Sequence, residues 1–308
     1  MSPIVVAGLT PAWQQVLVVD GFQPGAVNRA GRAYWCASGK VLNVGLALHH
    51  LAERRADASL NLAPLGGPAY EAIDHEFEQL GVPRRWVRTR SPTRVCTTIV
   101  DGAAGTATEL VENAGPLTAE ELTEFEDAFA SAAADAQVVV LTGSLPRGVP
   151  ADFFRRLLRQ APCPAVLDIR GAELLAALDA RPLVVKPNRD ELAHTLGTPI
   201  RTHEDLKLAM SELHRRGAQT VIVTAGAGEV RLRSAAGFRQ FTPPGVDRIV
   251  NPIGCGDAMA AGMAWAIGRG LDVESAVGHG LAAAAANLST LLPSDFDGQR
   301  ERLTRRKG

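Results

Sequence analysis

The chain contains the stretch Asn251-Pro252-Ile253-Gly254-Cys255-Gly256-Asp257, which runs directly into the small residues Ala258-Met259-Ala260-Ala261-Gly262-Met263-Ala264. Two glycines at a junction between a loop and a helix allow the backbone to approach a ligand closely. The first turn of such a helix has N–H groups without intrahelical partners, which favours binding of an anion. The pattern therefore predicts a phosphate-binding helix start. Asp257, in the first turn, would either cap this helix or accept a proton from an attacking hydroxyl.

The segments that precede this stretch indicate an α/β fold. From about Gly39 onward, helix-period and strand-period segments mostly alternate, which is the pattern of a sheet with crossover helices. Several of the strand segments are continuous apolar runs, as expected for strands that are covered on both faces. We predict strands at 4–9, 60–65, 138–141, 165–168, 183–185 and 220–223, and helices at 41–51 and 70–80.

Two regions, about 10–37 and 87–113, interrupt this alternation. Both are rich in Gly, Thr, Val and Arg, and they contain short strand-like pieces such as 94–100 and 106–111. Loops of this length without structure of their own are uncommon, so we predict a small β appendage inserted into the α/β body. The whole chain, 1–308, is then expected to be a single domain that carries this insertion.

Composition argues against several classes of protein. The 32 basic and 33 acidic residues leave a formal charge of -1, so no net field recruits nucleic acid or an anionic membrane. The four cysteines are far apart and form no C-x-x-C pair, which disfavours zinc and disulfide frameworks and suits a reducing compartment. The apolar run 4–9 follows no basic region and is too short for a signal peptide or a span. We expect a cytoplasmic protein that binds neither nucleic acid nor membrane.

Four motifs, in the right order, make the chain resemble the ribokinase-like, or PfkB, carbohydrate kinases. The stretch 251–264 is similar to the C-terminal signature of that family, in which an Asp after a Gly-Ala-Gly turn is the catalytic base. Residues 139–150, VVLTGSLPRGVP, are similar to a strand and loop of its phosphosugar branch, that of 1-phosphofructokinase and tagatose-6-phosphate kinase. Residues 186–192, KPNRDEL, match the family's K-P-N-x-x-E segment, and residues 37–44, ASGKVLNV, resemble its G-G-K-G-x-N-V-A signature.

This resemblance implies a Rossmann-like α/β/α body with a small β-sheet lid that closes over a sugar and excludes water. It implies transfer of a phosphoryl group from ATP, with Mg²⁺, to a hydroxyl of a sugar phosphate, a reaction that depends on positioning and charge stabilisation. Two alternatives stay open: a kinase of an unphosphorylated sugar or nucleoside, and a non-catalytic sugar-phosphate sensor. The family also implies a homodimer formed through the lid.

The resemblance assigns roles at the transfer centre and the nucleotide site. Asp257 would be the base, and the amides of Gly254, Cys255 and Gly256 would stabilise the charge on the transferring phosphoryl group. Asn188 and Glu191 would position Mg²⁺ through water, and their spacing also predicts a capping box at a helix start. The residues implied for nucleotide binding are Lys186, Asn188, Glu191, Thr224, Gly226 and Asn287.

The residues implied for the acceptor are Gln14, Arg29, Gly39, Lys40, Asn43 and Arg94. The basic residues Lys40, Arg94 and Arg29 are the candidates for binding a phosphate on the acceptor. Arginine suits this role because its guanidinium donates two hydrogen bonds at once. Gln14 stands where the branch usually has an Asp that holds sugar hydroxyls, and Ser38 and Val41 replace two glycines beside the sugar. With the transfer motifs intact, these departures indicate a changed specificity rather than a lost activity.

Overall fold

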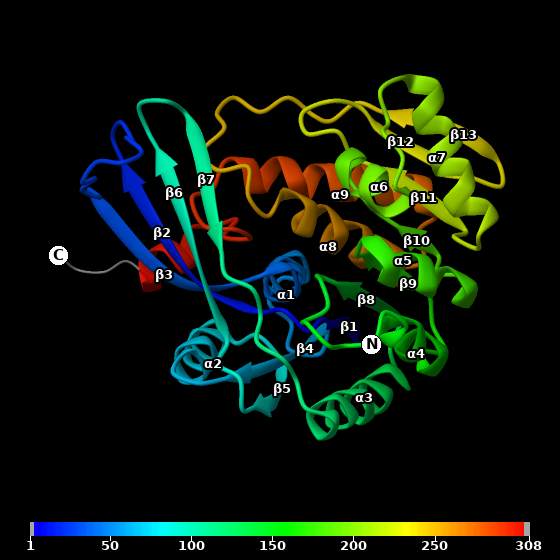
Figure 1. Cartoon of the computed structure of the whole chain (residues 1–308), viewed down its shortest axis with the longest axis horizontal. Coiled ribbons are helices and arrows are strands. Elements are labelled where there is room, and N and C mark those ends of the chain that lie inside the picture. Colours follow the sequence, from blue (N-terminus) through cyan, green and yellow to red (C-terminus); the bar gives the residue numbers. More distant parts are fainter. Residues whose placement is uncertain (1–2, 305–308) are drawn as a thin grey trace.

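The computed structural model describes residues 3–304, so residues 1, 2 and 305–308 of the predicted domain lie outside the described part. It contains a nine-stranded sheet in the order β13-β12-β11-β10-β9-β8-β1-β4-β5 and a separate four-stranded sheet (Figure 1). All neighbouring strands from β5 to β11 pair in parallel, whereas β12 and β13 pair antiparallel at one edge. The strands of the large sheet are β1 Ile4–Ala7, β4 Ser59–Gly66, β5 Arg84–Thr89, β8 Val138–Thr142, β9 Ala165–Asp168, β10 Val184–Val185, β11 Thr220–Val223, β12 Val230–Ser234 and β13 Gly237–Phe241.

Helices cover both faces of the large sheet. In β1, Ile4 and Val6 pack in one hydrophobic cluster and Val5 and Ala7 in another, because successive side chains of a strand point to opposite faces. The first cluster includes side chains of α1 Lys40–Leu51, α2 Ala69–Leu80, α8 Cys255–Gly268 and α9 Val273–Leu288. The second includes side chains of α3 Ala119–Ala133, α4 Phe153–Gln160, α5 Gly171–Ala177, α6 Arg189–Leu196 and α7 His203–Arg215, with the short helix η1 Leu178–Ala180. This layered arrangement confirms the predicted α/β fold.

The small sheet is formed by the two regions that interrupt the alternation in the sequence. Its strands lie in the order β3-β2-β6-β7, with bounds β2 Ala12–Val19, β3 Arg32–Ser38, β6 Arg94–Asp101 and β7 Thr106–Val111. One boundary differs from the prediction, since 87–89 belong to β5 at the edge of the large sheet. Only Val87 of β5 is buried, so this edge strand has no apolar run in the sequence.

The carboxyl ends of the parallel strands meet at one edge of the large sheet. Asp168 ends β9, Lys186 follows β10, and Thr224 follows β11. Ligands of open α/β sheets bind outside the carboxyl ends of the strands, so this edge is where a site is expected. Among the helices of residues 3–304, none combines the length and the hydropathy that a membrane span requires.

Candidate active site

A cleft with a volume of about 760 Å³ lies between the small sheet and the carboxyl ends of the parallel strands. Gln14, Arg94 and Glu109 line it from the small sheet, and Asp168 and Lys186 line it from the body. Most of the residues that the sequence predicts for the site are in its wall. These are Gln14, Gly39, Lys40, Asn43, Arg94, Lys186, Asn188, Glu191, Thr224, Gly226, Gly254, Cys255, Gly256 and Asp257.

The start of α8 has the glycine-lined geometry that the sequence predicts for an anion cradle. Gly254 has a φ of 84° and is the N-cap of the helix, and a Cβ there would lie 2.8 Å from the Cβ of Pro293. Only glycine fits this position without strain. A Cβ added at Gly256 would lie 3.5 Å from Nζ of Lys186, so an ammonium group stands beside the helix start. The amides of the first turn and this lysine together favour a phosphate group.

Asp257 is buried in the first turn of α8, with 6% of its surface exposed. Its Oδ2 accepts a hydrogen bond of 2.8 Å from Nδ2 of Asn43. Burial raises the pKa of Asp257 to about 7, an effect that Lys40 opposes and the nearby charge of Asp168 reinforces. A carboxyl group that titrates near neutral pH is suited to act as a general base.

Asp168 is a site residue that the sequence analysis missed. Its Oδ1 lies 3.2 Å from Nζ of Lys40 and 3.2 Å from Nζ of Lys186, and its side chain is 1% exposed. Burial alone would raise the pKa of Asp168, but the two lysines outweigh it and lower this pKa. The available signal was its position at the carboxyl end of a predicted buried strand.

Lys40 contacts carboxylates at the centre of the cleft. Besides Asp168, its Nζ lies 3.4 Å from Oε1 of Glu191. Burial alone would lower the pKa of Lys40, but the carboxylates of Asp168, Glu191 and Asp257 outweigh this effect, so the pKa is raised. Lys40 is therefore charged and lies among the predicted transfer residues, so an acceptor phosphate would have to compete with two carboxylates for it.

Asn188 and Glu191 form the predicted capping box at the start of α6. Oδ1 of Asn188 accepts from the N–H of Glu191, and Oε2 of Glu191 accepts from the N–H of Asn188. Within residues 3–304, no three His, Cys, Asp or Glu side chains are arranged to hold a metal ion. Oδ2 of Asp168, however, is buried and has no hydrogen-bond partner among the described residues. Such a donor set fits Mg²⁺ that is held mainly by nucleotide phosphates and water, with one or two carboxylates nearby.

The small-sheet end of the cleft carries both signs of charge. The guanidinium of Arg94 donates to the backbone carbonyls of Thr10, Pro11 and Glu112, at 2.9, 3.3 and 3.3 Å. Glu109 on β7 also lines this end and was missed, because the register of a predicted strand cannot be read from the sequence. Desolvation raises the pKa of Glu109, while Gln14 and Arg94 act in the opposite direction.

Two of the predicted site residues do not line the cleft. Arg29 is exposed in the loop between β2 and β3. Asn287 is fully buried in α9, where Nδ2 donates to the carbonyl of Ile253 at 2.9 Å and Oδ1 accepts from the N–H of Ser294. Asn287 thus stabilises the loop that precedes α8. Its position late in an Ala-rich helix did not reveal this role.

Comparison with known proteins gives matches along most of the chain. A model described as "pfkB family carbohydrate kinase" matches residues 1–295. Phosphofructokinase-2 from Escherichia coli, in complex with fructose-6-phosphate, superposes with a TM-score of 0.84 at 24% identity, covering 99% of each chain. A possible 1-phosphofructokinase from Thermotoga maritima gives 0.83 at 22% identity, covering 94% of this chain and 93% of that one. Ribokinase from the same organism gives 0.75 at 19% identity, covering 98% of each. At these identities the superpositions show a shared fold.

Proposed function

The chain belongs to the pfkB family of carbohydrate kinases, and from this membership and the geometry of the cleft we propose that it transfers the γ-phosphoryl group of ATP, with Mg²⁺, to a hydroxyl of a sugar phosphate. The observation that carries the proposal is the buried carboxylate of Asp257 at an open helix start, beside two lysines. A base, an anion cradle and fixed positive charge are what phosphoryl transfer requires of a protein.

In the proposed reaction, the γ-phosphoryl group lies against the amides of Gly254, Cys255 and Gly256. Asp257 takes the proton of the acceptor hydroxyl, and the hydroxyl oxygen forms a bond to the γ-phosphorus. At the same time the bond between the γ-phosphorus and the oxygen that bridges it to the β-phosphate breaks. Lys186 and the amides of the α8 start stabilise the charge on the equatorial oxygens, and ADP leaves. Bound Mg²⁺ would neutralise charge on the nucleotide phosphates.

The proposal is tested by measuring ADP formation with free and phosphorylated hexoses, pentoses and nucleosides as acceptors. We expect a phosphorylated hexose to stimulate ADP release most strongly. A protein that releases ADP at the same rate with and without every acceptor would contradict kinase activity of this cleft.

Removal of the metal is expected to abolish activity, and Glu191→Gln should raise the Mg²⁺ concentration for half-maximal rate about tenfold, as is typical for groups that hold a metal through water. Glutamine preserves the capping box, so α6 should remain intact. Asp205→Asn is the control, because Asp205 has the same capping position in α7, outside the cleft wall. An unchanged Mg²⁺ requirement in Glu191→Gln would remove Glu191 from the metal site.

A phosphate on the acceptor is proposed to contact Arg94, which lines the small-sheet end of the cleft. Within the described part of the chain, three of its five N–H groups donate to backbone carbonyls. Arg94→Ala should cost on the order of 1.5–3 kcal/mol in kcat/KM for the phosphorylated acceptor, the range for a hydrogen bond to a charged group. The free sugar should be a poor substrate of the wild type, and its kcat/KM should change little in Arg94→Ala. Arg90→Ala, an exposed arginine outside the cleft wall, is the control. Equal losses for both acceptors would reject the phosphate contact.

One observation favours an unphosphorylated acceptor as the second candidate. Glu109 faces the same end of the cleft as Arg94, and a carboxylate repels a phosphate but accepts hydrogen bonds from sugar hydroxyls. On this second account, Glu109→Gln should lower kcat/KM for free sugars. On the favoured account, the same variant should raise kcat/KM for the phosphorylated acceptor.

A homodimer formed through the small sheet is also proposed. The face of this sheet that points away from Gln14 and Glu109 carries the stacked rings of Trp13 and Trp35. On the same face, Val95 is 40% exposed and Leu110 is 59% exposed. An apolar surface of this kind is typical of a subunit interface. Light scattering should give twice the chain mass, and Leu110→Glu should give a monomer; a monomeric wild type would reject the proposal.

A further inference from the structure

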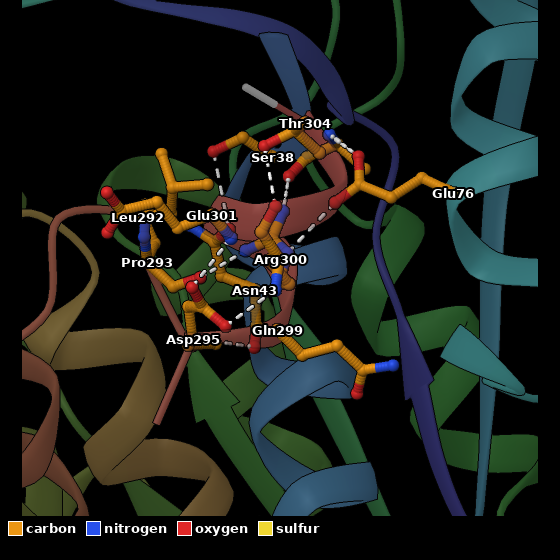
Figure 2. Close-up of polar contacts among 12 residues, drawn as sticks. Ser38, Asn43, Glu76, Leu292, Pro293, Asp295, Gln299, Arg300, Glu301 and Thr304 are labelled. Carbon is orange, nitrogen blue, oxygen red and sulfur yellow. Dashed lines mark hydrogen bonds and ion pairs between the residues drawn. The ribbon is translucent and has the colours of Figure 1, made fainter. Parts of the chain in front are cut away.

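Arg300, in the C-terminal helix α10 Gln299–Thr304, is buried although it is charged, with 2% of its surface exposed. Figure 2 shows how Glu76, Pro293 and Asp295 surround it. Nε lies 2.9 Å from Oε1 of Glu76, Nη1 donates to the carbonyl of Pro293, and Nη2 donates to the carbonyl of Ala37 at 2.5 Å. The guanidinium therefore joins α2, β3 and the C-terminal segment.

Both backbone polar groups of Ala37 are held by this ion pair. Its N–H donates to Oε2 of Glu76 at 2.6 Å, and its carbonyl accepts from Arg300. A buried ion pair adds little stability over apolar packing, but it can specify one geometry when all its groups are paired. The geometry specified here is that of the turn at Ser38 and Gly39, where β3 leaves the small sheet and enters α1.

The same C-terminal segment also contacts α1 directly. Ser294, at a φ of 61°, donates from Oγ to the carbonyl of Asn43 at 2.8 Å. Asp295 accepts from the N–H groups of Arg300 and Glu301, at 2.8 Å each, and so fixes the start of α10. The segment thus reaches Asn43 through Ser294 and reaches Ser38 through Ala37.

Both contacts reach Asn43, Ser294 through the backbone carbonyl and Ser38 through the side-chain amide. Oγ of Ser38 lies 3.3 Å from Oδ1 of Asn43, and this contact orients the amide so that Nδ2 points at Asp257. If the turn or α1 shifted, the amide could rotate and lose its hydrogen bond to Oδ2 of Asp257. That hydrogen bond favours the charged form of the carboxyl group.

We infer that Arg300 and Ser294 are positioning residues, which act through Ser38 and Asn43 to orient the carboxylate of Asp257 for proton abstraction. This inference rests on the proposed role of Asp257 as the base. It gives the C-terminal segment 291–304, which lies against β3 in Figure 1, a part in the reaction at a distance from the cleft wall.

Other charged and titratable groups also face Asp257. Lys40 comes from α1, Asp168 from the end of β9, Lys186 from the segment after β10, and Cys255 from α8 itself. None of these four side chains contacts Arg300 or Ser294 within residues 3–304. A change in the titration of Asp257 on mutation of Arg300 or Ser294 would therefore pass through Asn43.

The test is the pH dependence of kcat in Arg300→Met and Ser294→Ala. Arg300→Met should lower kcat about 10- to 100-fold, the loss expected for a slightly misplaced catalytic group, with little change in the KM for ATP. In both variants the acid limb of the profile should move to higher pH, because Asp257 loses a donor that favours its charged form. Ser294→Ala removes only one hydroxyl and keeps the test decisive if Arg300→Met fails to fold.

Arg54→Met is the matched control. Arg54 forms an exposed ion pair with Asp297 on the same segment, and this variant should keep the wild-type kcat and pH profile. Variants of Arg300 and Ser294 that unfold at a lower temperature but keep the wild-type kcat and acid limb would show a purely structural role and overturn the inference. A shift of equal size in Arg54→Met would overturn it as well. If Asp257 were not the base, Asp257→Asn would retain turnover. This variant therefore separates a failure of the proposed role of Asp257 from a failure of the inference on Arg300 and Ser294.

Discussion

Asp257→Asn is expected to lower kcat by about two orders of magnitude or more while the affinity for ATP changes little, the effect of losing a positioned base. The physical reason is that Asn cannot accept the proton of the acceptor hydroxyl. Asp190→Asn is the control, because Asp190 is an acidic residue in the first turn of α6 that does not line the cleft. Wild-type turnover in Asp257→Asn would reject Asp257 as the base.

The raised pKa of Asp257 gives this variant a second signature. The unfolded chain loses this proton near the ordinary value of 3.8 and the folded chain near 7, so the folded state binds more protons between these values. The contribution of Asp257 to the stability of the wild type therefore falls as the pH rises through this window. Asp257→Asn should be more stable than the wild type at pH 8, with the difference shrinking toward pH 4, while the acid limb of wild-type kcat/KM should have its midpoint near 7. Thermal unfolding at several pH values checks the first statement.

Asp168→Asn is expected to lower the free energy of unfolding by about 3–5 kcal/mol near neutral pH, the typical cost of removing one partner of a buried ion pair. Lys186, which is 3% exposed, would lose its counter-ion, whereas Lys40 would keep Glu191. Because the folded-state pKa of Asp168 is lowered, its stabilisation is present above the ordinary pKa and disappears as the pH falls through the lowered one. Added ATP should recover part of the loss, since its phosphates can pair with the lysine.

Urea unfolding with and without ATP measures this effect. Asp179→Asn is the matched control, because Asp179 pairs with Arg155 and Arg159 and its side chain is 50% exposed. Such surface pairs are worth about 0–1 kcal/mol. If Asp168→Asn were as stable as Asp179→Asn, Asp168 would not be the stabilising buried counter-ion of Lys186.

Features that depend on neighbours in the sequence were predictable. The glycines around Cys255 with Asp257 in the next turn, and the capping box of Asn188 and Glu191, are each encoded within a few residues. The apolar strand β8 could be read in the same way, because a strand covered on both faces has few polar positions. These local patterns were enough to predict the α/β body and the glycine-capped start of α8.

Contacts between distant segments were not predictable. Asp168 joins Lys40 and Lys186, and its role depends on the order of β9 and β10 in the sheet. Glu109 faces the cleft only because of the register between β6 and β7. The ion pair of Arg300 with Glu76 spans 224 residues of chain, so neither residue carries a signal in its own surroundings.

Transfer of a phosphoryl group from ATP to a sugar phosphate can be followed with a label on that group. The protein is incubated with Mg²⁺ and ATP radiolabelled at the γ-phosphate, with fructose 1-phosphate, fructose 6-phosphate, tagatose 6-phosphate or the corresponding free sugars. We expect the label in a sugar bisphosphate, and we expect about a hundredfold less of it, or lower still, with Asp257→Asn over the same time. Label found only in inorganic phosphate, or in the monophosphate of a free sugar with none in a bisphosphate, would contradict the account.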